Sequence, residues 1–142
     1  MRALLIIDIQ RDYFPGGAYP LAGPEEAAAA ARRVLDRFRG DGEPVIEKSE
    51  ANGFLGTPLE DRLRSDGIDE LVVAGMMSSM CVDATVRAAA DKGFAVTVVH
   101  DACAAPDLEF EGATIPGASV HGAFMAALGQ GYATVVSSTE LA

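Results

Sequence analysis

A short apolar run followed by helical spacing lies near the middle of the chain. Residues 71–74 (Leu-Val-Val-Ala) lead into Gly75, and after this glycine Val82 and Val86 recur at the spacing of one helix face. Gly93 stands where that helix would end. The pattern predicts a buried strand, a tight turn and a helix.

Four other apolar runs have the length and composition of strands, and helical segments separate most of them. The expected strands are residues 3–7, 44–48, 71–74, 94–99 and 132–137. Strands that alternate with helices favour parallel βαβ units. We therefore expect an α/β fold, a three-layer α/β/α sandwich around a doubly wound, Rossmann-like parallel sheet of about five strands. No linker or repeat divides residues 1–142, so one domain is expected.

Two acids, an amine and a thiol fall at or just beyond the expected carboxyl ends of four strands: Asp8, Asp101, Lys48 and Cys81. Ligands of doubly wound sheets gather at that edge. Cys81 would also lie in the first turn of a helix, where unpaired N–H groups and the helix dipole lower a thiol pKa and offer donors to an oxyanion.

These groups are the parts of a nucleophilic hydrolase. Asp8 can accept the thiol proton, Lys48 can hold Asp8 ionised, and Cys81 can attack a carbonyl carbon. The residues by themselves leave two plainer interpretations open. Cys81 would then be a small buried apolar residue, and Asp8 and Lys48 a solvated ion pair.

Three motifs in this order resemble one family. They are residues 5–14 (Leu-Ile-Ile-Asp-Ile-Gln-Arg-Asp-Tyr-Phe), residues 44–48 with 54–59, and residues 73–85 around Met-Met-Ser-Ser-Met-Cys. This arrangement is similar to that of the isochorismatase-like cysteine hydrolases, which include nicotinamidases, carbamoyl-amine amidases and streptothricin hydrolases. The resemblance extends over nearly the whole chain.

The resemblance implies a catalytic triad of Asp8, Lys48 and Cys81 and an oxyanion hole formed by the backbone N–H groups of Met77 and Cys81. It also implies a cis peptide between Met76 and Met77. The expected substrate is a small-molecule amide whose C–N bond is cleaved through a thioester. Candidates for the substrate pocket are Tyr13, Phe14, Asn52, Phe54 and Met76.

The chain departs from the family pattern between the first helix and the Lys48 strand. A strand and a long loop are expected there, but residues 38–44 bridge the two directly. That segment supplies metal ligands in nicotinamidases, so neither a metal nor another cofactor is expected. His100, His121 and Cys103 are interpreted as structural. To avoid a gap in the sheet, residues 44–48 are predicted to pair directly with residues 3–7. Alternatively, a neighbouring chain could fill the gap.

The amino-acid composition restricts the kinds of partner that the protein is expected to bind. The formal net charge of −10 argues against a nucleic-acid or anionic-membrane surface. No apolar run approaches the length of a membrane span. Two cysteines without metal-ligand spacing suggest a reducing compartment, so a cytoplasmic protein is expected. A homo-oligomer, either a dimer or a tetramer, is expected as well.

Two other functions stay open at this point. One is an isochorismatase-type hydrolase of a vinyl ether, against which Cys81 argues because members with that activity lack the nucleophile. The other is a catalytically impaired binding protein or relic, which the missing segment makes plausible.

Overall fold

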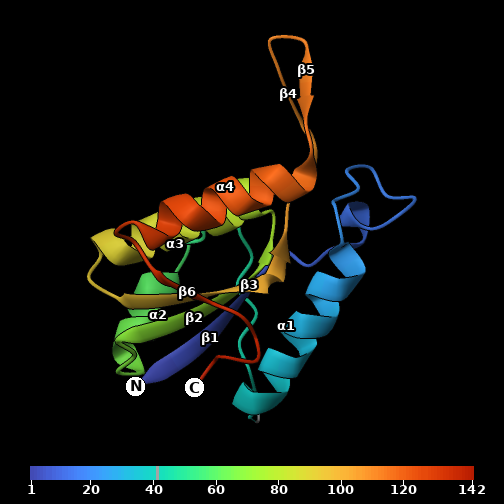
Figure 1. Ribbon diagram of the computed structural model, residues 1–142. Coiled ribbons are helices and arrows are strands. Elements are labelled where there is room, and N and C mark those ends of the chain that lie inside the picture. Colours follow the sequence, from blue (N-terminus) through green and yellow to red (C-terminus); the bar gives the residue numbers. More distant parts are fainter. Residues whose placement is uncertain (41) are drawn as a thin grey trace.

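The computed structural model describes residues 1–40 and 42–142. Its main sheet has four parallel strands in the order β1-β2-β3-β6 (Figure 1). They are β1 (Arg2–Ile7), β2 (Glu70–Met76), β3 (Ala95–Ala104) and β6 (Thr134–Val136). The α/β class and the parallel sheet are confirmed, although the sheet has four strands rather than five.

Helices cover both faces of the sheet. On one face, α1 (Pro24–Phe38) buries Ala30, Ala31 and Val34 against side chains of β2 and β3. On the other face lie α2 (Leu59–Ser65), α3 (Asp83–Asp91) and α4 (Gly117–Gly129), which share a larger apolar cluster with the three strands β1, β2 and β3. Two short helical turns follow β1 and β2, namely η1 (Arg11–Tyr13) and η2 (Ser78–Val82). No helix among residues 1–40 and 42–142 is long and apolar enough to cross a bilayer.

The prediction for residues 44–48 is wrong. They form no strand, and no backbone hydrogen bond joins them to β1 in the part of the chain that the structure describes. Pro44 has no N–H to donate, and Ile46 packs against the apolar cluster beneath α2. The loop that follows is fastened to α3, because the hydroxyl of Thr85 accepts a hydrogen bond from Gly53 N at 2.9 Å. These contacts hold the segment away from β1, which is left as an edge strand.

A hairpin that the sequence analysis missed projects from the body between β3 and α4 (Figure 1). Its antiparallel strands are β4 (Leu108–Phe110) and β5 (Ala113–Ile115). The turn residues Glu111 and Gly112 both have positive φ, as in the two-residue turns that suit hairpins. The sequence contained a signal for this hairpin, because residues 108–110 (Leu-Glu-Phe) alternate apolar and polar side chains directly before the turn residues Glu-Gly. One face of the hairpin is apolar and exposed, and it includes Phe110.

Gly75 allows β1 and β2 to approach closely just before the predicted nucleophile. Its φ is +137°, and a Cβ atom there would lie 2.0 Å from the carbonyl oxygen of Ile7. The β2–β3 register also shifts between Val73 and Gly75. This position therefore requires glycine.

Candidate active site

The structure brings Asp8, Lys48 and Cys81 together. Lys48 Nζ lies 2.6 Å from Asp8 Oδ2 and 3.4 Å from Cys81 Sγ. Asp8 follows the end of β1, and Cys81 lies in η2, just beyond the end of β2. The expected placement of the thiol between a strand and a helix is therefore observed. The peptide between Met76 and Met77 is cis, as the family resemblance implied.

Lys48 reaches this position although its segment is not a strand. Its ammonium also donates to the carbonyl of Glu50 at 3.0 Å, so all three donors have partners. The side chain is 16% exposed, and that of Asp8 is 29% exposed. Burial lowers the pKa of Lys48, but hydrogen bonds to Asp8 and Cys81 and their charges outweigh it, and the net shift is upward. The ammonium therefore stays charged at neutral pH.

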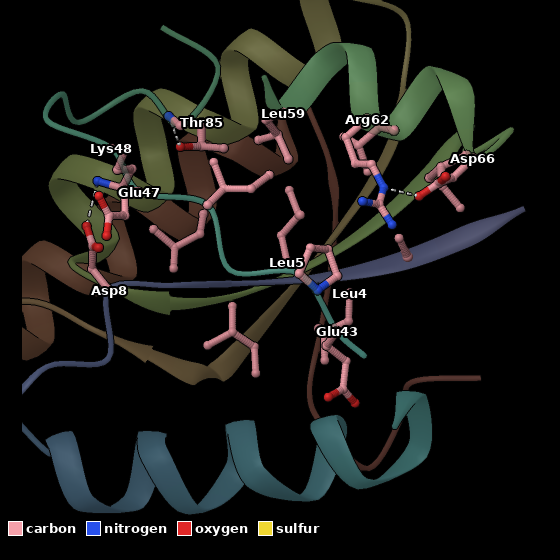
Figure 2. Close-up of a pocket in the computed structure, with 18 residues that line it drawn as sticks. Leu4, Leu5, Asp8, Glu43, Glu47, Lys48, Leu59, Arg62, Asp66 and Thr85 are labelled. Carbon is pink, nitrogen blue, oxygen red and sulfur yellow. Dashed lines mark hydrogen bonds and ion pairs between the residues drawn. The ribbon is translucent and has the colours of Figure 1, made fainter. Parts of the chain in front are cut away.

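Asp8 has an unusual backbone conformation. Its φ is +44°, in the left-handed region that non-glycine residues seldom occupy. Such conformations cost about 1–3 kcal/mol and cluster at functional sites. The turn directs the Asp8 carboxylate to Lys48 rather than along the direction of β1 (Figure 2).

The pKa of the Cys81 thiol is raised, which corrects the expectation of a lowered value. Burial is the main cause, and the hydrogen bond and negative charge of Asp8 act in the same direction. Lys48 opposes them without overcoming them. The resting site therefore holds a thiol beside a carboxylate base, so the proton has to move to Asp8 as the sulfur attacks.

A tether from α3 that the sequence analysis did not identify supports Lys48. The Thr85 side chain, which is buried, accepts from Gly53 N at 2.9 Å and donates to Ala51 O at 3.4 Å. The loop that carries Glu50 is thereby held against the helix that follows Cys81. The only available signal was Thr85 itself, four residues after the nucleophile and thus on the same face of the helix.

The pocket candidates divide into two groups. Tyr13 is buried, and its pKa is raised first by burial and also by Cys81 and Asp8, which places the phenol within their electrostatic reach. Phe14 is partly buried beside Tyr13. These two remain candidates for the pocket wall.

The other three candidates have structural contacts. Phe54 is buried in the core and stacks on Phe94 with ring centroids 6.0 Å apart. The side chain of Asn52 accepts from Phe54 N at 2.9 Å and shapes the turn. Met76 is fully buried beneath the site. None of the three side chains is shown facing the triad.

Asp101 does not join the site. Because β3 continues to Ala104, Asp101 lies within the strand, and its carboxylate accepts from the N–H and hydroxyl of Ser138 at 2.7 and 2.6 Å. His121 Nδ1 lies 2.7 Å from the hydroxyl of Ser78 in η2. Burial and His100 lower the His121 pKa, so the ring is neutral and braces the turn that holds Cys81.

The two thiols are expected to differ in reactivity. Cys81 is partly exposed, whereas Cys103 is buried and its pKa is raised to about 12 by burial. Iodoacetamide at pH 8, followed by peptide mass analysis, should modify Cys81 first, and its rate should keep rising with pH because the thiolate fraction grows. Faster modification of Cys103 in the folded protein would contradict this assignment.

Comparison with known proteins agrees with the fold and identifies the family. Residues 39–139 match the family model described as Isochorismatase domain. The uncharacterised isochorismatase family protein YddQ of Bacillus subtilis is 41% identical over 169 aligned positions, which cover 94% of each chain. A solved isochorismatase from Pseudomonas putida is 32% identical, with a TM-score of 0.93 over 99% of this chain and 90% of its own. N-carbamoylsarcosine amidase of an Arthrobacter species is 52% identical over 63 residues, 44% of this chain and 24% of its own.

The fold is thus that of an α/β protein with polar side chains gathered at the carboxyl edge of a parallel sheet. The chain belongs to the isochorismatase family. The YddQ alignment has 169 positions and includes 94% of the 142 residues here, so about 35 positions of that relative have no counterpart in this chain. The family resemblance predicts that they fall between α1 and residue 44.

Proposed function

We propose that this protein hydrolyses the C–N bond of a small-molecule amide through a thioester on Cys81. The main support for this proposal is that Lys48 contacts both Asp8 and Cys81, which places a base and a nucleophile around one ammonium group. Amidase relatives such as the carbamoylsarcosine enzyme support the choice of bond.

In the first half of the reaction, Asp8 takes the thiol proton while Sγ of Cys81 bonds to the amide carbon. Negative charge develops on the carbonyl oxygen, and the N–H groups of Met77 and Cys81 are proposed to donate to it. The C–N bond then breaks, protonated Asp8 gives its proton to the nitrogen, and the amine or ammonia leaves. A thioester remains.

In the second half, Asp8 is again a base. It takes a proton from water, whose oxygen attacks the thioester carbon, and the carboxylic acid leaves as the sulfur recovers the proton. Lys48 keeps Asp8 ionised between these steps and lies where it also stabilises charge on the sulfur. No metal or cofactor is part of this proposal.

A panel of small primary amides and N-carbamoyl amines, with release of ammonia or amine as the readout, tests the proposed function. Cys81→Ala should abolish turnover, while Cys103→Ala should retain it because that thiol is buried, its pKa is raised to about 12, and it lies outside the proposed triad. Equal turnover by Cys81→Ala and the unaltered protein would exclude the thioester. Absence of turnover on the whole panel would favour the catalytically impaired alternative.

The proposed partners are a small amide and further copies of the chain. A homo-oligomer, dimer or tetramer, remains a prediction, and light scattering coupled to gel filtration measures it directly.

A further inference from the structure

A groove runs along the free edge of β1. Residues 3–8 form one side of it, residues 43–48 the other, and α2 its floor, with a cavity volume of about 650 Å³ (Figure 2). The apolar part of its lining belongs to the main core and includes Leu5, Ile46, Leu59 and Leu63. At one end the groove reaches the Asp8–Lys48 ion pair (Figure 2).

Backbone groups of β1 face this groove. The carbonyl of Met1 accepts from Asp69 N and Glu70 N, so the odd-numbered residues of β1 direct their backbone groups to β2. Successive residues of a strand alternate, and the N–H and C=O of Leu4 and Ile6 therefore point away from β2. No partner for them is found within residues 1–40 and 42–142.

This edge has none of the features that prevent strand pairing. Residues 3–7 contain no charge, no proline and no bulge, and Ile6 is 40% exposed. Apolar, regular edges of this kind accept strands from other chains. The facing residues 43–48 form no backbone hydrogen bond with other described residues either. A strand in the groove could therefore pair on both sides.

The charges around the groove indicate which strand would fit. Asp8 is paired with Lys48 and Asp66 with Arg62, whereas Glu47 has no ion-pair partner in the described part of the chain. Glu43 has only a distant one, Arg39 at 3.8 Å. The groove is therefore lined by more acidic than basic side chains. A second copy fits it poorly, because the chain carries a net charge of −10 and its exposed hairpin carries Glu109 and Glu111.

We propose that the groove beside β1 is an acceptor site for an extended segment of a partner protein, in which apolar residues alternate with lysine or arginine. The apolar side chains pack toward Leu59 and Leu63, and the basic ones meet Glu43 and Glu47. Pairing with residues 43–48 would also steady the segment that delivers Lys48.

A synthetic peptide of about eight residues that alternates valine with lysine and threonine is the probe. Hydrogen exchange followed by NMR should show at least tenfold slower exchange for the amides of Leu4 and Ile6 when the peptide is bound. The amides of Leu5 and Ile7 already face β2 and should not change. Protection of all four amides alike, or of none at saturating peptide, would overturn the proposal.

Two matched peptides test the chemistry. N-methylation of alternate backbone nitrogens removes ladder donors and should weaken binding at least tenfold in fluorescence anisotropy. Replacing lysine by glutamate should weaken it similarly at low salt, and Glu47→Lys should restore part of that loss. Equal affinities for the three peptides would refute strand pairing. If Leu4 and Ile6 are already protected in a free homodimer, a second copy occupies the groove and the proposed partner is wrong.

Discussion

Replacing Asp8 by asparagine is expected to lower kcat by ~10²-fold or more while increasing the rate at which Cys81 is alkylated. The amide cannot take the thiol proton, so turnover falls. The carboxylate is also one of the groups that raise the thiol pKa, so its removal lowers that pKa and increases the thiolate fraction at a given pH. Turnover and alkylation should therefore change in opposite directions.

Lys48→Ala should change both quantities in the same direction. Its ammonium lowers the Cys81 pKa, so its loss slows alkylation and also lowers kcat ~10²-fold or more. Asp83→Asn is the matched control for Asp8→Asn. Asp83 is two residues from Cys81 but pairs with Arg87 at 2.9 Å, so its replacement should change neither quantity substantially. The measurements are steady-state turnover on an amide identified in the panel and iodoacetamide kinetics against pH. Near-normal turnover in Asp8→Asn or Lys48→Ala would show that the triad is wrongly assigned.

Gly75→Ala is expected to destabilise the fold by roughly 3–6 kcal/mol. A Cβ atom would lie 2.0 Å from the Ile7 carbonyl oxygen, where only backbone could yield, and φ of +137° is disfavoured for alanine. Urea unfolding followed by circular dichroism gives the change from the midpoint and slope.

Gly93→Ala provides the comparison. Its φ is +83°, but nothing lies within 4 Å of the Cβ position. We expect a cost of about 1–2 kcal/mol from the left-handed conformation alone. Similar losses in both variants would mean that the close approach of β1 and β2 contributes nothing.

The sequence by itself determined most of the fold and the identity of the three central residues. Short apolar runs separated by helical spacing specify parallel βαβ units, because each periodicity allows only one way to bury its apolar face. The grouping of Asp8, Lys48 and Cys81 was expected from their positions at the ends of those runs. The cis peptide was expected only from the family resemblance. Lys48 also lies beside its expected neighbour, the Asp8 carboxylate.

Only the tertiary structure decided the position of residues 44–48 and the state of the thiol. Residues 44–48 have the composition of a strand, but pairing also requires a neighbour, and anchoring of the next loop by Thr85 keeps them from reaching β1. The helix dipole favours a thiolate at Cys81, whereas burial and the Asp8 carboxylate raise its pKa and prevail. Both outcomes depend on distances between segments far apart in the chain, which periodicity and local motifs do not encode.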